Sequence, residues 1–226
     1  CGPESRLGNQ KWESEGCECI RLTKREDLTS NSGLELALKA VRVVNCCLMV
    51  SIPCTGGSQI FRTNCHRPGY KDRARRHRKV FCALMKNLVV VTREAQKYGA
   101  RIIVEWPRNC NYWQEPIVQK YLHENQLKPV QVDGCAVGLR SYINGLPIYK
   151  PWTIATNDAI IHEALRGLRC PGVQPGHLHK RCESGDTKRT ESYTDDLVQR
   201  IHDAFKRSVA EGPLNSGLRR LTPDKQ

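Results

Sequence analysis

The alternation of apolar runs and amphipathic stretches constrains the fold of this chain more than any other feature. Residues 46–52 and 101–106 are short, almost continuous apolar runs, as in strands that are buried on both faces of a parallel sheet. Longer stretches with apolar residues at i, i+3 and i+4, such as 74–98, are typical of helices. This order predicts an α/β fold, with a doubly wound, mostly parallel sheet and helices on both faces.

Shorter patterns predict the remaining elements. Ser32 and Glu35 have the spacing of a capping box at the start of a helix, and Thr194 is expected to cap the last helix. We expect one domain over residues 1–210 and a flexible polar tail at 211–226. Further strands are predicted at 18–23, 129–133 and 147–156, and further helices at 116–124 and 158–167.

The charge of the chain indicates the class of its partner. Lys and Arg number 36 against 23 acidic residues, so the net charge is +13 and a polyanion is the expected partner. Six of the nine residues at 71–79 are Lys or Arg, and so dense a run repels itself unless phosphates or acids neutralise it. The alternative is the solvated start of a helix. The residues expected to contact nucleic-acid phosphates are Arg62, Lys71, Arg73, Arg75, Arg76 and Arg78.

Neither a membrane nor a secretory route is expected. No apolar run approaches the roughly 20 residues that cross a bilayer, and the first residues do not resemble a signal peptide. We therefore expect an intracellular protein without a membrane partner, and the nucleus is one candidate compartment. Because the chain begins with Cys1 and not with Met, we expect it to be a segment of a longer polypeptide.

The twelve cysteines are expected to be mostly reduced and buried, because several lie inside apolar runs. A cluster near the end of the chain could instead ligate zinc. Its spacing fits no common zinc finger, and the surrounding Pro and Gly residues favour a His-rich surface loop without a metal. The zinc alternative would draw its ligands from His162, Cys170, His177, His179 and Cys182.

Two strand ends carry side chains that are suited to chemistry. Cys54 follows the apolar run at 46–52, and Glu105 lies at the end of the run at 101–106. Ligands gather at the carboxyl ends of the strands in doubly wound sheets, so we expect these two side chains to face one crevice. The alternatives are a buried structural thiol and a carboxylate that caps a backbone N–H group.

These motifs resemble a known family. Pro53-Cys54, followed by Ser58, and Glu105-Trp-Pro are similar to the Pro-Cys-x-x-x-Ser and Glu-Asn-Val motifs of cytosine-5 DNA methyltransferases. From residue 1 to about 206, the chain more closely resembles methyltransferase-like segments of eukaryotic mobile-element polyproteins. The motifs that carry this second resemblance are Asp133-Gly-Cys-Ala-Val-Gly138, Lys150-Pro-Trp152, His177-Leu-His179 and Glu191-Ser-Tyr193.

The resemblance implies a Rossmann-like methyltransferase fold and a mechanism. Cys54 would add to C6 of a flipped cytosine, and Glu105 would act as the acid at N3. The basic residues downstream would lower the pKa of Cys54. Lys150 lies where the family has a basic motif, and is added to the residues expected to bind nucleic acid. A recognition-like insert would occupy about 157–190, which is short for a duplex-reading region.

The resemblance also implies S-adenosylmethionine as the methyl donor. The family places a glycine-bearing loop after its first strand, and the corresponding residues 1–9 depart from its usual Phe-x-Gly-x-Gly pattern. The acid that the family has after its second strand is displaced here to Asp27. Trp106, Tyr112 and Trp113 are expected in the core, with base stacking as the alternative. The residues expected to bind the cofactor are Gly2, Pro3, Gly8, Asp27 and Pro53.

Three functions therefore stay open. The chain is an active DNA (cytosine-5) methyltransferase, or a catalytically silent nucleic-acid-binding module of a mobile-element polyprotein. The third alternative, methyl transfer to an amino group, is less favoured because it needs no thiol. DNA is favoured over RNA as the partner.

Overall fold

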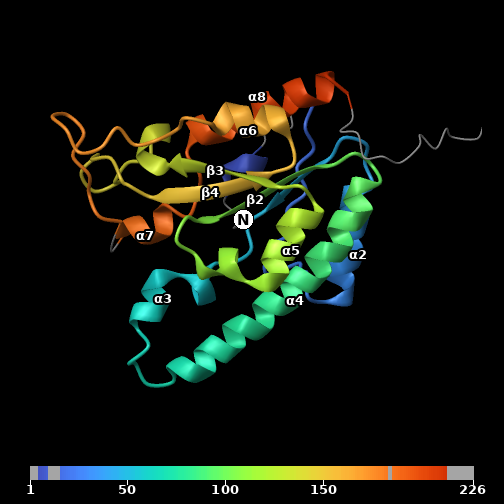
Figure 1. The fold of residues 1–226 in the computed structure, drawn as a ribbon, viewed down its shortest axis with the longest axis horizontal. Helices are drawn as coiled ribbons and strands as arrows, with labels where there is room; N and C mark the ends of the chain where they lie inside the picture. Colours follow the sequence, from blue (N-terminus) through green and yellow to red (C-terminus); the bar gives the residue numbers. More distant parts are fainter. Residues whose placement is uncertain (1–4, 10–15, 183–184, 213–226) are drawn as a thin grey trace, which may run out of the picture.

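The computed structural model describes residues 5–9, 16–182 and 185–212. They form an α/β fold around a four-stranded mixed sheet with the order β1-β2-β4-β3 (Figure 1). The strands are β1 (Cys47–Val50), β2 (Arg101–Pro107), β3 (Lys128–Asp133) and β4 (Pro151–Thr156).

The strand directions correct the prediction of a mostly parallel sheet. β1 and β2 are parallel, but β4 is antiparallel to both of its neighbours, β2 and β3. A buried apolar run has the same composition in either direction, so periodicity could not reveal this reversal. Because β1, β2 and β3 still point the same way, their carboxyl ends meet at one edge of the sheet, beside the start of β4.

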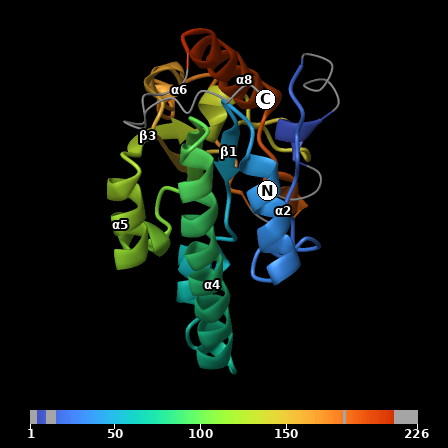
Figure 2. The same ribbon diagram turned by 90° about the vertical axis from the view of Figure 1, so that its right-hand side faces the viewer.

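Helices cover both faces of the sheet, as predicted (Figures 1 and 2). Neighbouring residues of β2 alternate between the two layers: Ile103 belongs to the core under α6 and α8, whereas Ile102 and Val104 face α4 and α5. A third apolar cluster joins α2 to α4. The helices are α2 (Asn31–Val41), α3 (Gln59–Thr63), α4 (Tyr70–Gln96), α5 (Pro116–Glu124), α6 (Ala159–Leu165), α7 (Gly185–Arg189) and α8 (Asp195–Ala210). Short 3-10 helices are η1 (Arg6–Gly8), η2 (Thr55–Gly57), η3 (Asn111–Gln114) and η4 (Gly134–Val137).

The helices and strands lie close to their predicted ranges, although α4 begins at Tyr70 and not at 74, and β4 begins at Pro151 and not at 147. Two further predictions do not hold. The strand predicted at 18–23 is wrong: this segment is irregular, and Ile20 is half-exposed and does not join the sheet. The capping box is displaced, because Ser30 and not Ser32 accepts the hydrogen bond from Gly33 N–H at the start of α2. The predicted Thr194 cap is confirmed, since its hydroxyl accepts from Leu197 N–H.

Two further expectations concern the whole chain. All eleven cysteines within the described residues are free thiols, as expected. The expectation that most are buried is wrong, because only Cys110 of these is buried, nine are partly exposed and Cys65 is exposed. The predicted tail lies largely outside the described residues, which end at 212. No helix in the described part has both the length and the apolar character needed to cross a membrane.

Candidate active site and basic surface

The carboxyl ends of β1 and β2 bring the predicted thiol and carboxyl to the same edge of the sheet. Cys54 stands four residues after β1 and begins η2, and Glu105 lies near the end of β2. Ser51 connects the two strands, because its hydroxyl donates to Glu105 Oε2 over 3.3 Å. Cys54 is half-buried, and Glu105 is only 6% exposed.

Burial controls the protonation of both groups. Desolvation raises the pKa of the Glu105 carboxyl, although hydrogen bonds from Tyr193 and Ser51 and the charge of Lys150 oppose this shift. Desolvation also raises the pKa of the Cys54 thiol, and the nearby Glu105 charge raises it further. The lowered pKa that was expected for Cys54 is therefore wrong, because burial outweighs the single opposing cation, Lys150.

Tyr193 is the closest partner of the buried carboxyl. Its hydroxyl donates to Glu105 Oε2 over 2.6 Å, from a position directly before α8 and 88 residues away in the sequence. Tyr193 is itself buried, with its ring against Trp152. Sequence reasoning identified neither Tyr193 nor Ser51 as site residues. Two signals could have identified them. Ser51 lies near the end of a buried apolar run, and Tyr193 belongs to one of the motifs that carry the family resemblance.

Lys150 lies beside residues of this site and not on α4. Its ammonium donates to the carbonyl oxygen of Thr190 over 2.5 Å and lies 6.0 Å from the ring centre of Trp152. Its positive charge lowers the pKa of both Cys54 and Glu105. The expectation that Lys150 binds nucleic acid stays a prediction, with its ammonium beside Thr190 and Trp152.

The turn that presents Cys54 requires glycine. A Cβ atom on Gly56 would lie 2.3 Å from the Tyr112 hydroxyl and 2.7 Å from His77 Cβ, and one on Gly57 would lie 2.8 Å from Cys110 Sγ. All three distances are too short for non-bonded atoms unless the neighbours move. Therefore η2 can pack against η3 and α4 only if these two positions carry no side chain.

The aromatic residues after β2 form core and not a stacking platform, which confirms the favoured prediction. Trp106, Tyr112 and Trp113 are all at most 7% exposed. Trp106 donates to the carbonyl oxygen of Ile52 over 2.6 Å, and Phe81 stacks on Tyr112 with the ring centres 3.8 Å apart. These contacts hold the end of β1 against α4.

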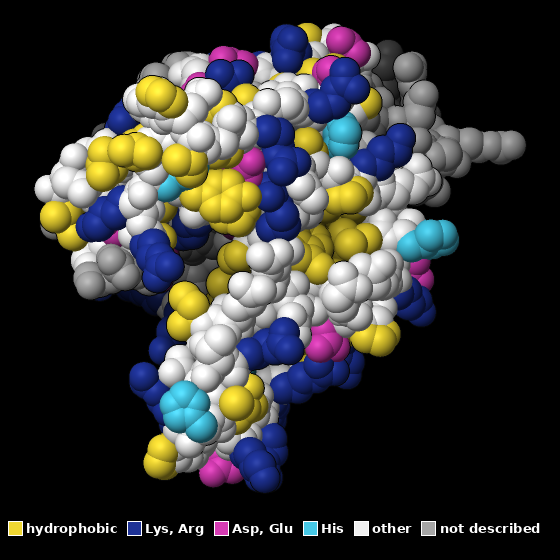
Figure 3. Space-filling model, turned by 60° about the vertical axis from the view of Figure 1, so that its left-hand side comes forward, with side chains coloured by type: hydrophobic (Ala, Val, Ile, Leu, Met, Phe, Trp, Pro, Cys, Tyr) yellow, Lys and Arg dark blue, Asp and Glu magenta, His cyan; other side chains and the backbone are white. Residues whose placement is uncertain are grey.

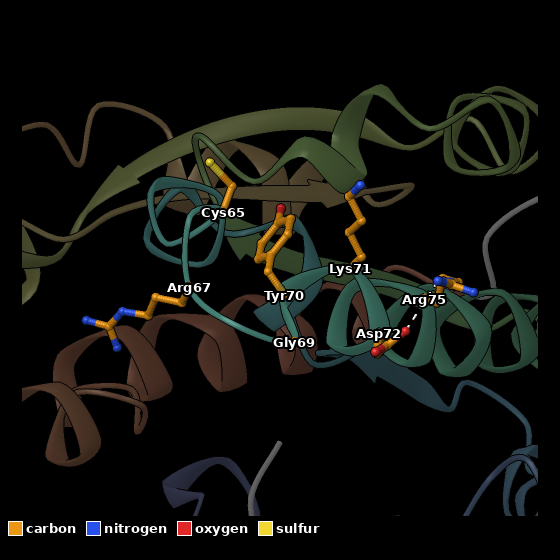
Figure 4. A pocket seen from close by; sticks show the side chains of 7 residues that line it. All are labelled: Cys65, Arg67, Gly69, Tyr70, Lys71, Asp72 and Arg75. Atoms are coloured by element: carbon orange, nitrogen blue, oxygen red, sulfur yellow. Dashed lines mark ion pairs between the residues drawn. The ribbon is translucent and has the colours of Figure 1, made fainter.

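The predicted basic run covers the first turns of α4, which project from the sheet together with α3 (Figures 1 and 3). A hollow of about 370 Å³ lies beside the start of the helix, lined by residues that include Lys71 and Arg75. Figure 4 shows Tyr70 and Lys71 extending to the same side, whereas Arg67 points away from them. We refer to the exposed side chains of Lys71, Arg75, Arg76 and Lys79 as the basic surface.

The other predicted phosphate contacts are partly engaged within the protein. Arg78 forms an ion pair with Glu115, and Arg73 donates to the carbonyl oxygen of Pro68 over 2.9 Å. Arg62 donates to Asn111 over 2.9 Å. Arg75 contacts Asp72 at 3.3 Å, but its side chain is 79% exposed and its pair is screened by solvent.

Ring contacts link the basic surface to the Cys54 turn. Phe61 of α3 stacks on Tyr70 with the ring centres 4.8 Å apart, and meets the edge of His77 at 5.1 Å. A Cβ atom on Gly56, two residues after Cys54, would lie 2.7 Å from His77 Cβ, so α4 packs closely against the Cys54 turn.

The residues predicted to bind S-adenosylmethionine do not form a cradle within the described part of the chain. Gly2 and Pro3 lie outside the described residues. The space beside Gly8 is occupied by the Arg21 side chain, because a Cβ atom on Gly8 would lie 2.9 Å from Arg21 Nε. The Asp27 carboxylate accepts from the backbone and hydroxyl groups of Thr29, which lowers its pKa and closes its own turn. Pro53 is exposed.

The Cys and His residues near the end of the chain converge in an unexpected combination. Cys170, His177 and His179 lie together, and the fourth member of the cluster is Cys135 of η4. Cys182 lies elsewhere, with its sulfur 3.1 Å from the Thr190 hydroxyl, and is wrong as a member of this set. His162 lies on α6 against the carbonyl oxygen of Pro129.

Comparisons with family models, with curated proteins and with solved structures find no match for this chain. The functional argument therefore depends on the geometry of the sites.

Proposed function

We propose that the chain is a nucleic-acid-binding, methyltransferase-like domain in which Cys54 and Glu105 act on a cytosine base. The observation that carries the proposal is the placement of a thiol and a buried carboxyl at the carboxyl ends of two adjacent parallel strands, close enough for the charge of Glu105 to raise the pKa of Cys54. In a sheet of this kind a charged group is seldom buried without a partner or a ligand that uses it.

The two groups would act on the base in complementary ways. As the S–C6 bond forms, the Cys54 thiol gives its proton to solvent and the C5–C6 double bond breaks. Glu105, whose pKa is raised by burial, would give its proton to N3, so that the added electron pair does not leave the ring charged. The methyl donor that the resemblance implies has no cradle among the described residues, and the proposed chemistry ends at this adduct.

Three neighbours would position the reacting groups. Ser51 and Tyr193 both donate to Glu105 Oε2, which fixes that oxygen and leaves Oε1 as the atom available for a base. Lys150 favours the thiolate form of Cys54, and so opposes the effect of burial. The basic surface would hold phosphates of the same strand, in contacts that position a strand without reading its sequence.

A mechanism-based probe tests the nucleophile. An oligonucleotide with 2-pyrimidinone at one position forms a stable adduct with a thiol at C6 and needs no methyl donor. We expect wild-type protein to form this adduct, seen as a retarded band on a denaturing gel, and Cys54→Ser to form none. Cys65→Ser is the matched control, because Cys65 is an exposed thiol beside the basic surface. An adduct that persists in Cys54→Ser, or is lost only in Cys65→Ser, would overturn the assignment.

A salt titration tests the basic surface. For single-stranded DNA, each phosphate contact contributes about 0.7 to the slope of log affinity against log salt. Replacement of Lys71, Arg75 and Arg76 by Ala should therefore reduce that slope by about 2. The control triple Lys120→Ala, Arg166→Ala and Arg200→Ala removes the same charge from exposed ion pairs on α5, α6 and α8 and should leave the slope unchanged. Equal effects of the two triples would remove the basic surface from the proposal.

A catalytically silent nucleic-acid-binding module is the second candidate, and two observations favour it. The raised pKa of Cys54 leaves little thiolate at neutral pH, and Glu105 already has two partners inside the protein. The two experiments separate the candidates. Salt-dependent binding without an adduct, even at alkaline pH, would show a module that binds nucleic acid without chemistry.

A further inference from the structure

Four side chains converge beside the carboxyl end of β3, at some distance along the sheet edge from the thiol and carboxyl. Cys135 comes from η4, Cys170 from the segment after α6, and His177 and His179 from the loop that follows. Each offers one ligand atom, and the four atoms all lie within 4.8 Å of one another. We refer to these four residues as the Cys2His2 cluster.

The distances within the Cys2His2 cluster fit a tetrahedral metal ion. Cys170 Sγ lies 3.5 Å from His177 Nε2 and 3.3 Å from His179 Nε2, and the two Nε2 atoms are 3.0 Å apart. With Zn–S near 2.3 Å and Zn–N near 2.0–2.1 Å, a regular tetrahedron has S–N edges of about 3.5 Å and N–N edges of about 3.3 Å. These three edges lie within about 0.4 Å of that geometry, and Cys135 Sγ lies within 4.8 Å of the other three ligand atoms.

Hydrogen bonds cannot account for this convergence. Each Nε2 atom carries either one proton or one lone pair, so it can make one directed hydrogen bond. Here the Nε2 atoms of His177 and His179 each face the other and also the same sulfur. A cation at the centre would satisfy all of these atoms at once, because every ligand then directs a lone pair to the same point.

The surroundings hold the cluster in place, as the second shell of a metal site does. The backbone N–H of Cys170 donates to Asp133 over 2.9 Å, and Asp133 is 2% exposed and is also bound by Arg108. Gly172 N–H donates to Cys170 Sγ over 3.3 Å, a contact that stabilises a thiolate. A β-bridge between Gln174 and His177 shapes the loop that carries both histidines.

We propose that Cys135, Cys170, His177 and His179 form a zinc site with a structural role. Two thiolates and two imidazoles in tetrahedral arrangement are the ligand set that zinc prefers. Four protein ligands fill its coordination sphere, whereas catalytic zinc keeps a position open for water. The proposal does not depend on the proposed function, since none of the four residues belongs to the Cys54–Glu105 site.

The metal would tie the loop at 170–182 to the end of β3. Beyond the two histidines, Lys180 pairs with Ile148 in a β-bridge and forms a 2.8 Å ion pair with Asp186 of α7. The same segment continues to Thr190 and Tyr193, which contact Lys150 and Glu105. Loss of the metal would therefore loosen a segment that reaches the candidate active site.

Metal analysis of the intact chain tests the site. We expect one equivalent of zinc per chain in purified protein, and Co²⁺ replacement should give the strong visible bands of a tetrahedral ion with thiolate ligands. Cys135→Ser should lose the metal, whereas Cys182→Ser should retain it. This pair separates the fourth ligand indicated by the structure from the one that the sequence spacing suggests.

A labelling experiment on wild-type protein tests the site even if the variants fail to fold. In wild-type protein, zinc should protect Cys135 and Cys170 from alkylation, and a chelator should remove the protection, while labelling of the exposed Cys65 stays the same. Mass spectrometry of the peptides reads out each cysteine. Absence of bound metal after reconstitution with Zn²⁺, a Cys135–Cys170 disulfide, or protection of Cys182 in place of Cys135 would each overturn the proposal.

Discussion

The two polar clusters at the carboxyl edge of the sheet differ in how their polar atoms are satisfied. Around Glu105, donors from Ser51 and Tyr193 complete one carboxyl oxygen, and the apolar surroundings raise its pKa. At the end of β3, Asp133 accepts from two arginines and a backbone N–H, which lower its pKa, and the neighbouring Cys2His2 cluster points four ligand atoms at one another. Burial thus favours the protonated form of Glu105, whereas the donors around Asp133 favour its charged form.

This difference shows what each cluster is suited for. A buried carboxyl with a raised pKa is suited to give a proton to a bound base, which is a chemical role. An ionised carboxylate with three donors is a fixed anchor, and anchors of this kind orient metal ligands. The two clusters are thus expected to lose different amounts of stability on mutation and to respond to pH with opposite signs.

The largest effect is expected at the anchor. Asp133→Ala leaves Arg108, which is 17% exposed, without its carboxylate, and frees the backbone of Cys170. Removal of one partner from a buried ion pair costs 3–5 kcal/mol, and because Arg169 is half-exposed we expect about 3 kcal/mol. Urea unfolding measures the loss. Asp196→Ala, which breaks an exposed pair with Arg200, should cost less than about 1 kcal/mol.

A smaller effect is expected at the acid. Tyr193→Phe removes one hydrogen bond from Glu105 but keeps the ring against Trp152, so we expect a loss of about 1–2 kcal/mol. It should also raise the pKa of Glu105 further, since the Tyr193 hydroxyl favours the charged form. The same urea titration gives the free energy. A loss larger than that of Asp133→Ala would reverse the ranking of the two clusters.

The smallest effect concerns pH and has opposite signs at the two carboxyls. The folded pKa of Glu105 is raised above 4.5, so its contribution to stability is present below that value and is lost as the pH rises through the folded pKa. The folded pKa of Asp133 is lowered below 3.8, so its contribution is present above that value and is lost as the pH falls.

Glu105→Gln isolates the acid in that comparison, because the amide oxygen can still accept from Tyr193 but cannot ionise. We expect the variant to lack the fall in stability that Glu105 gives the wild type above pH 4.5. Thermal unfolding across this range in both proteins measures the difference. If the two curves stay parallel, Glu105 is ionised in the folded protein, and its role as an acid is wrong.

Much of the fold could be predicted from local pattern. The long helix of α4, the exact span of α5 and the buried strand β2 all follow from apolar periodicity and caps, which are properties of neighbouring residues. The strand expected at 18–23 failed because a short apolar run also fits an irregular segment at the surface. The direction of β4 could not be predicted, since pairing depends on residues far along the chain.

The candidate sites divide in the same way. Cys54 and Glu105 could be located because each follows or ends a buried strand, and parallel neighbours bring such ends together. Tyr193 comes from 88 residues beyond Glu105, and Cys135 from 35 residues before Cys170, so no spacing rule connects them. Cys182 had the closer spacing, yet its sulfur contacts Thr190.

The sequence by itself determined the α/β class, the helix on which the positive charge is concentrated, and the chemical types available for catalysis and metal binding. Local propensity and charge are properties of single residues and their neighbours, so they can be predicted without knowing the fold. Only the tertiary structure decided which cysteine completes the Cys2His2 cluster, which hydroxyl contacts the buried acid, and that burial raises the pKa of the Cys54 thiol. These outcomes depend on distances and on exclusion of water between distant segments, and both exist only after the chain has packed.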